Sequence, residues 1–388
     1  MSKKLTAVLT TLTLSAVLGA CSSGSPEGNE TQQTVKVGGI FDLSGPTSDV
    51  GVPYSKGIEG FVTYWNQQGN KPKIKLVSED ARYDVPTALR VYSRLKQEGV
   101  VAIQGWGTGD TEALRGRVTA DHIPFMSVSY AQTLTDPSKT PFNFVPGTTY
   151  SLQMRLALQH IARQSPGAHV ASFYSDTPFG ESPQQAGAQE ADHLGLGFKT
   201  YAMPAGATDY EPQLNRAKAQ GATYVIIQNV PTPAAQLVKN IKAQGLDMKV
   251  VCLNACAGEL LTTLAGKAAE GALGIMPFAP VSAPVEGLAQ PRKFLADNGG
   301  NLDKQGVNYV QAWYTMAVMA EGIKYAADHG KVTGNSVKQA LQSIGAFNTG
   351  DVSTPIDFSD TSHAGMKSAA TYQVKNGKWT ILTPSAPR

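Results

Sequence analysis

A loop rich in glycine and hydroxyl side chains, residues 105–111 (GWGTGDT), has the composition of a site for a small anion. It follows the apolar run VVAIQ and precedes a helical pattern, so we expect it between a strand and the N-terminus of a helix. Its glycines let a ligand approach the backbone, and Thr108 can donate a hydrogen bond beside the free amides of the helix. Trp106 can supply an apolar wall. The loop indicates a carboxylate site, and a glycine-rich turn capped by Thr108 or Asp110 is the simpler alternative.

Similar polar loops follow other expected strands. In the first half of the chain they are residues 42–47 (DLSGPT) and 127–130 (SVSY). In the second half they are residues 175–180, the pair Gln228-Asn229, and residues 254–256. Ligands of open α/β sheets bind beyond the carboxyl ends of the strands, so these loops are the segments that we expect to surround a ligand.

The chain lacks the patterns of nucleotide, metal and nucleophile sites. Asp110 stands where the third glycine of a dinucleotide loop would be, and Gly266-Lys267-Ala268 lacks the rest of a phosphate loop. The six histidines are scattered, with no pair at metal-binding spacing, and no nucleophile elbow is found. We therefore expect no cofactor, no metal and no enzymatic activity. The formal net charge of +3 gives no reason to expect nucleic acid as a partner.

Strand and helix patterns alternate from Val35 onward, which predicts an α/β fold with doubly wound parallel sheets. Expected elements include a helix from Pro53 to Gln68, a long helix over residues 307–327 and a closing hairpin at Asn376-Gly377. The alternation restarts after residues 141–149 (PFNFVPGTT), and 388 residues exceed the size of one core, so two lobes are expected. We assign residues 35–147 and 279–350 to lobe 1 and residues 148–278 and 351–388 to lobe 2. The chain would cross between them near Gly147, Phe278 and Gly350.

The N-terminus has the form of a secretory signal. Lys3 and Lys4 precede an uncharged apolar run, and Leu18-Gly19-Ala20-Cys21 resembles the lipobox of bacterial lipoproteins. This predicts a signal peptide over residues 1–20, lipidation of Cys21 and a flexible tether over residues 21–34. An ordinary signal peptide with a chance cysteine is the alternative. The protein would lie in the periplasm or on the outer face of the cell membrane, held there by the lipid alone. In that compartment Cys252 and Cys256 could be two free thiols or a short-loop disulfide, which we favour.

Motifs spread over residues 35–388 resemble the leucine-isoleucine-valine-binding proteins and their relatives, the type I substrate-binding proteins of branched-chain amino acid ABC importers. In chain order these motifs are residues 43–46 (LSGP), 79–81 (EDA), 105–111, 179–181 (FGE) and 269–271 (AEG). The resemblance implies two doubly wound α/β lobes joined by a three-strand hinge, the periplasmic binding protein type I fold. It also implies that the lobes close around one small solute.

The resemblance further implies which residues contact the solute. Thr108 takes the place of the hydroxyl residue that holds the ligand carboxylate, and the second contact falls on Ser129 or Tyr130. Together with the loops above, the expected ligand-binding residues are Trp106, Gly107, Thr108, Ser129, Tyr130, Phe179, Gln228, Asn229 and Asn254.

The chain departs from the resembled family at the ligand amine. Relatives that bind α-amino acids carry an acidic residue in the loop matching residues 252–256 (CLNAC) and a tyrosine near Asn229 or Val230, and neither is present. A buried ammonium without a carboxylate is costly. Either Asp110 or Asp176 pairs with the amine, or the solute is not a standard amino acid. Aromatic acids, amides and short carboxylates are all handled by relatives.

The sequence thus predicts a monomeric solute-binding lipoprotein that captures a small carboxylate-bearing solute, a branched-chain amino acid or a related compound. It would deliver this solute to a permease and ATPase complex of an ABC importer. A receptor of the same fold that reports ligand occupancy to a sensor is the alternative.

Overall fold

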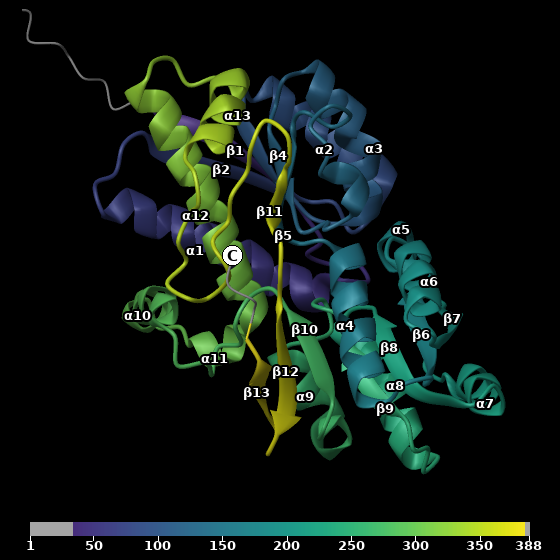
Figure 1. Cartoon of the computed structure of the whole chain (residues 1–388). Helices are drawn as coiled ribbons and strands as arrows, with labels where there is room; N and C mark the ends of the chain where they lie inside the picture. Colours follow the sequence, from purple (N-terminus) through teal and green to yellow (C-terminus); the bar gives the residue numbers. More distant parts are fainter. Residues whose placement is uncertain (1–33, 385–388) are drawn as a thin grey trace, which may run out of the picture. The chain divides into compact units, whose positions relative to one another are not determined.

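Six strands form the first sheet, and all of their pairings are parallel. The computed structural model describes residues 34–384 (Figure 1). The strand order in this sheet is β11-β5-β4-β3-β1-β2. The strands are β1 (Thr34–Phe41), β2 (Lys73–Asp80), β3 (Ala102–Gly105), β4 (Phe125–Ser127), β5 (Asn143–Thr148) and β11 (Ala364–Met366).

Seven strands form the second sheet, in the order β13-β12-β10-β9-β8-β6-β7. They are β6 (His169–Ser175), β7 (Gly197–Met203), β8 (Ala222–Gln228), β9 (Lys249–Cys252), β10 (Leu273–Met276), β12 (Ala370–Lys375) and β13 (Lys378–Thr383). The strands β6 to β10 pair in parallel, whereas β12 and β13 are antiparallel additions at one edge. Asn376 and Gly377 join β12 to β13 with positive φ angles of 52° and 72°, so the expected hairpin is confirmed.

Helices connect the strands of each sheet. Among the strands of the first sheet these helices are α1 (Ser48–Gln67), α2 (Val85–Gln97) and α3 (Thr108–Ala120), followed by the 3₁₀ turn η1 (Gln132–Leu134). Between β5 and β10 the chain forms α4 (Tyr150–Gln164), α5 (Pro178–Glu181), α6 (Gln184–His193), α7 (Glu211–Ala219), α8 (Pro231–Ala243), α9 (Glu259–Ala265) and η2 (Gly266–Ala269). After β10 come η3 (Glu286–Leu288), α10 (Ala289–Asp297), α11 (Leu302–Gln305), α12 (Val307–Asp328) and α13 (Gly334–Ser343). Within the described part of the chain no helix is both long and apolar enough to cross a membrane.

The first helix begins earlier than its sequence predicts. Proline is common at the first helical position, but Pro53 lies inside α1, which starts at Ser48. The added residues are held by the preceding loop, because Thr47 accepts hydrogen bonds from the N–H groups of Val50 and Gly51. Gly51 is required there, since a Cβ at this residue would lie 2.0 Å from the carbonyl oxygen of Asp42.

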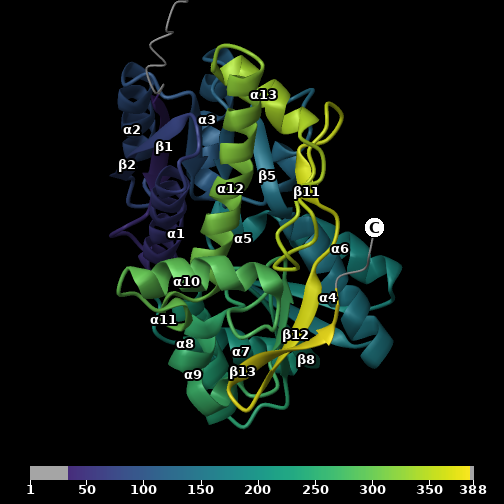
Figure 2. The ribbon, with the colours of Figure 1, turned by 90° about the vertical axis from the view of Figure 1, so that its left-hand side faces the viewer.

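The long helix α12 packs against α1, although about 240 residues separate them in the sequence (Figure 2). Gly57 makes this approach possible, because a Cβ at this residue would lie 2.4 Å from the carbonyl oxygen of Tyr309. Phe61 of α1 meets Trp313 of α12 edge to face, with ring centroids 5.3 Å apart. Helix α12 is thereby held beside the first sheet, and its N-terminus lies close to the second lobe.

Three segments connect the two lobes, and the last of them lies later in the chain than predicted. The first crossing follows β5, and the second follows β10, where Phe278 forms an isolated bridge with Ser353. The third falls between β11 and β12, because Ala364 of β11 pairs with Val145 of β5 in the first sheet. The expected crossing near Gly350 is therefore wrong. Strand β11 has three residues, too few to show a strand period.

Candidate functional site

A cavity lies where loops following strands of both sheets meet. The empty space among its side chains is about 440 Å³, counting the part that is open to solvent. Its lining residues are Thr47, Val50, Tyr83, Trp106, Gly107, Thr108, Val128, Tyr150, Phe179, Val230, Asn254, Ala255, Asn308 and Gln311.

The walls of the cavity are mainly apolar and aromatic. Tyr150 and Phe179 meet edge to face with ring centroids 5.3 Å apart. Trp106 packs against the buried Tyr54, and the centroids of these two rings are 5.4 Å apart. The polar groups of the lining are hydroxyls, amides and backbone atoms. Among the described residues no charged side chain lines this space.

The N-terminus of α3 opens directly onto the cavity. Gly107 is the N-cap residue and has no side chain to satisfy the first amides, and the first backbone hydrogen bond of the helix runs from Thr111 to Gly107 at 3.1 Å. The amides before Thr111 therefore have no partner within the helix, and they attract an anion. Glycine is required at the cap, because a Cβ at Gly107 would lie 2.1 Å from the ring of Tyr83.

Thr108 lines the cavity, and Ser129 supports it from behind. The Ser129 hydroxyl donates to Thr108 Oγ1 at 2.8 Å, so the Thr108 hydroxyl keeps its own proton for another acceptor. Ser129 is completely buried and does not line the cavity. Tyr130 is also completely buried, and its hydroxyl accepts a hydrogen bond from the lining residue Gln311. Ser129 and Tyr130, which were expected to contact the ligand, thus lie behind the wall of the cavity.

Trp106 is fixed in the wall by a chain of hydrogen bonds. Its indole N–H donates to Thr47 Oγ1 at 2.8 Å, and the Thr47 hydroxyl donates to Asp42 Oδ2 at 2.6 Å. Asp42 also accepts from the backbone N–H groups of Gly45 and Thr47. The indole N–H is consequently used within the protein, and the ring contributes an apolar surface.

Asp110 is buried in the first turn of α3 and does not line the cavity. Neither of its carboxylate oxygens has a hydrogen-bond partner within residues 34–384. Burial raises the pKa of Asp110 to about 7; the nearby amides of Gly107 and Thr111 oppose that increase, and the charge of Asp42 adds to it. A neutral Asp110 leaves the partial positive charge of the helix N-terminus uncompensated.

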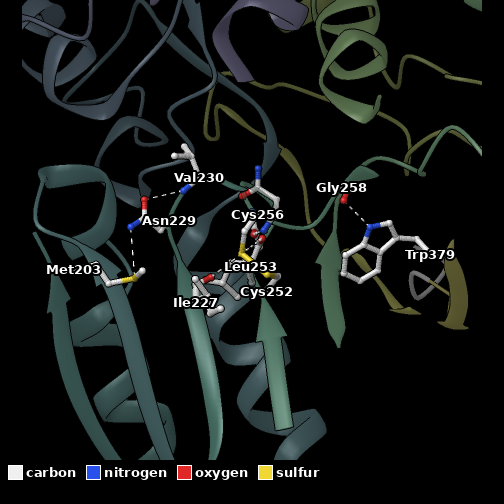
Figure 3. Close-up of a disulfide and its surroundings, with 11 residues drawn as sticks. Met203, Ile227, Asn229, Val230, Cys252, Leu253, Cys256, Gly258 and Trp379 are labelled. Atoms are coloured by element: carbon white, nitrogen blue, oxygen red, sulfur yellow. Dashed lines mark hydrogen bonds between the residues drawn. A yellow bond between two sulfur atoms is a disulfide. The ribbon is translucent and has the colours of Figure 1, made fainter. Parts of the chain in front are cut away.

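Two of the expected residues in the second lobe support the wall and do not reach the cavity. Gln228 is buried and donates from Nε2 to the carbonyl oxygen of Phe179 at 3.2 Å, which fixes the segment carrying the Phe179 ring. The Asn229 side chain accepts from the N–H of Val230 at 2.8 Å and points its Nδ2 toward Met203 (Figure 3). Val230, the next residue, does line the cavity.

A disulfide holds the loop that carries Asn254. Cys252 and Cys256 are bridged, with their Cα atoms 5.5 Å apart, so the favoured pairing is confirmed (Figure 3). The backbone N–H of Asn254 donates to Gln153 Oε1 at 2.9 Å. Asn254 and Ala255 both line the cavity, and Asn254 Oδ1 is buried without a hydrogen-bond partner in the described part of the chain.

A hydrogen-bonded contact joins the two lobes beside the cavity. Asp49, in the first turn of α1, accepts from the backbone N–H of Thr232 at 3.2 Å and from its hydroxyl at 2.7 Å. Burial raises the pKa of Asp49, and the bonds from Thr232 oppose this. Thr232 belongs to the first turn of α8, so the carboxylate also lies at a helix N-terminus.

Five of the nine expected ligand-binding residues line the cavity: Trp106, Gly107, Thr108, Phe179 and Asn254. The lining residues outside the nine expected ones are Thr47, Val50, Tyr83, Val128, Tyr150, Val230, Ala255, Asn308 and Gln311. Thr47, Val128 and Ala255 belong to loops that were expected to surround the ligand, and Val50 and Val230 directly follow other expected residues or lie within three residues of them. Asn308 and Gln311 lie in the first two turns of α12, and no local pattern could have placed them here.

Comparison with known proteins gives consistent matches over nearly the whole chain. Residues 34–378 match a family model described as periplasmic binding protein. The leucine-, isoleucine-, valine-, threonine-, and alanine-binding protein of Pseudomonas aeruginosa is 22% identical over 355 residues, which cover 88% of this chain and 92% of that protein.

Solved structures agree with this match. A branched chain amino acid ABC transporter protein from Thermus thermophilus with bound valine has a TM-score of 0.87 and 27% identity, covering 92% of this chain and 97% of that chain. An ABC transporter substrate binding protein from Aeropyrum pernix has a TM-score of 0.85 and 29% identity, covering 91% and 95%.

The buried Asp110 predicts a pH dependence of stability. Between pH 4 and pH 7 the carboxyl is ionised in the unfolded chain and protonated in the folded one, so wild-type stability falls as pH rises through this window. Asp110→Asn cannot ionise, and it should gain up to about 4 kcal/mol relative to wild type between pH 4 and pH 8. Urea unfolding at several pH values measures this.

Asp121→Asn is the matched control at the other end of α3. The pKa of Asp121 is lowered, with the hydrogen bond from Lys96 as the main cause, so its contribution is complete above about pH 5. Its difference from wild type should be constant from about pH 5 to pH 8. A constant difference for Asp110→Asn as well would contradict the assignment of a neutral Asp110.

Proposed function

The chain belongs to the periplasmic binding protein family and is a substrate-binding protein of ABC transporters, not an enzyme, and on this premise we propose that its cavity captures a small carboxylate-bearing solute for import. The solute is a branched-chain amino acid or a related compound. Valine is bound in the similar Thermus thermophilus structure, and the Pseudomonas aeruginosa relative is named for aliphatic amino acids. The partners are the solute and a permease with its ATPase, and the protein acts as a monomer.

The observation that carries this proposal is the head of α3, where free amides and the Thr108 hydroxyl face an apolar cavity. A carboxylate seated there accepts from backbone N–H groups and from Thr108, which Ser129 orients. The aromatic and branched walls bury the apolar part of the solute.

Closure of the lobes makes binding tight and gives the permease a state to recognise. The cavity takes Thr108 from the first lobe and Phe179 and Asn254 from the second, so a bound solute contacts both. Each such contact stabilises the closed form over the open one. The bond between Asp49 and Thr232 adds to the closed form without touching the solute.

We also propose that the protein is a lipoprotein anchored through Cys21 on the outer face of the cell membrane or in the periplasm. Cys21, the signal at residues 1–20 and the tether at residues 21–34 lie outside the described residues, apart from Thr34, which opens β1. The proposal is supported by the Leu18-Gly19-Ala20-Cys21 pattern in the sequence.

Thr108→Val tests the carboxylate contact, because it removes the hydroxyl and keeps the size of the side chain. A hydrogen bond to a charged group contributes about 1.5–3 kcal/mol, so affinity should fall by roughly 10- to 100-fold. Calorimetric titration with valine and with 3-methylbutanoate, after removal of any copurified solute, measures this. Thr119→Val is the control, since the Thr119 hydroxyl lies at the far end of α3 and bonds to Arg115. Equal affinities in both variants would rule out the proposed contact.

Thr232→Val tests the contact between the lobes. Loss of the hydroxyl bond to Asp49 should destabilise the closed form and speed dissociation of the bound solute by roughly tenfold. Stopped-flow measurement of the dissociation rate gives the readout. Thr263→Val in α9, whose hydroxyl bonds within its own helix, should leave the rate unchanged. An unchanged rate in Thr232→Val would show that the Asp49 bond does not hold the lobes together.

Cys21→Ser tests the anchor in the full chain expressed in a bacterium. The wild-type protein should fractionate with the membrane and incorporate labelled fatty acid, because two or more acyl chains bind a bilayer stably. The variant should be soluble and unlabelled. Fatty-acid labelling that persists in Cys21→Ser would place the modification elsewhere.

A further inference from the structure

Among the described residues the cavity lining has no carboxylate to pair with a positive charge on the solute. Every side chain of its lining is neutral, and the polar ones belong to threonine, tyrosine, asparagine and glutamine residues. A cation that enters such a site loses its hydration, and neutral dipoles only partly replace it. A negative charge on the solute is therefore favourable at the head of α3. A charge elsewhere in the cavity is unfavourable.

Three carboxylates that bond to lining residues or stand beside them in the fold are already used or shielded. Asp42 is completely buried and accepts hydrogen bonds from Thr47 and Gly45. Asp49 is bonded to Thr232 in the contact between the lobes. Asp110 lies behind Gly107 with less than a tenth of its surface exposed, and burial raises its pKa to about 7. None of the three belongs to the lining, and neither does Asp176, which is exposed.

Asn254 is the polar group of the second lobe that remains available. Its Oδ1 atom is buried with no hydrogen-bond partner in the part of the chain that the structure describes, while the residue itself lines the cavity. The disulfide on both sides of the loop and the bond from its backbone N–H to Gln153 hold it in place. An unpaired buried carbonyl oxygen costs free energy, and a neutral donor on the solute, such as a hydroxyl, would remove that cost.

We infer that the solute is an apolar carboxylic acid without an α-ammonium group, and that Asn254 is the residue that determines this preference. The inference rests on the proposed function and specifies the solute class of the same cavity. A branched or aromatic acid fits the walls, its carboxylate faces α3, and a 2-hydroxyl group can donate to Asn254 Oδ1. An aspartate at this position would instead favour an amine.

Matched compounds that differ only at the second carbon test the inference. Valine, 2-hydroxy-3-methylbutanoate and 3-methylbutanoate form one series, and phenylalanine, 2-hydroxy-3-phenylpropanoate and 3-phenylpropanoate form the other. The full chain is freed of copurified solute by unfolding and refolding, and each compound is titrated by calorimetry. In at least one series the hydroxy acid should bind the wild-type protein at least about 100-fold more tightly than the amino acid.

Asn254→Asp tests the role of the residue with almost no change of shape. It should strengthen binding of the amino acid at least tenfold and weaken binding of the hydroxy acid by a similar factor, which reverses or removes the preference. Asn335→Asp is the matched control, because it makes the same charge change at an exposed residue in the first turn of α13. Circular dichroism and the melting temperature verify that each variant is folded. Asn254→Ala should bring the hydroxy acid and the unsubstituted acid closer in affinity.

The outcomes separate this inference from the proposed function. If the wild-type protein binds valine or phenylalanine as tightly as the hydroxy acid, the inference is wrong and the proposed function stands. If the hydroxy acids are preferred but Asn254→Asp leaves the preference intact, the role of Asn254 is wrong. Failure of all six compounds to bind a folded wild-type protein would overturn the proposed function for small carboxylates, and the inference with it.

Discussion

The free amides at the head of α3 are the feature on which the rest of the site depends. They are available because Gly107 has no side chain to cap them and because a larger residue there would collide with Tyr83. An ionised carboxylate at Asp110 would neutralise the same end of the helix and repel a bound anion. Burial raises the pKa of Asp110 to about 7, so near neutral pH this carboxyl carries less negative charge than an exposed aspartate, and the helix end keeps more of its positive character for the solute. The site thus favours an anion because the negative charge of a nearby carboxyl is reduced, and not because a cationic side chain is added.

Residues behind the wall hold the residues that form it. Ser129 orients Thr108, Tyr130 binds Gln311, and Gln228 binds the backbone of Phe179. The disulfide performs the same task for Asn254. Rigid walls lower the entropy that must be lost when a small solute binds, which suits a protein that recognises few functional groups. The polar residues of these loops thus divide into those that face the cavity and those that support them.

The connections between the lobes leave room for motion while keeping the lobes aligned. Strand β5 and strand β11 run side by side next to the first and third crossings, and Phe278 bridges to Ser353 at the second. The packing of α1 against α12 lies within one lobe and need not change when the lobes move. Contacts such as the bond from Thr232 to Asp49 can break and form with closure at modest cost.

The sequence alone determined the α/β class, the two lobes and the loop of residues 105–111, because each depends on local patterns. Strand and helix periods, the glycines near Thr108 and the Asn376-Gly377 hairpin all act over a few residues. Tertiary structure decided which way each loop residue points, so that Thr108 lines the cavity and its partner Ser129 does not. It also brought Gln311 to the cavity and β11 to the first sheet, from positions far along the chain. These contacts depend on how helices and strands pack across the whole fold, and no short stretch of sequence encodes that packing.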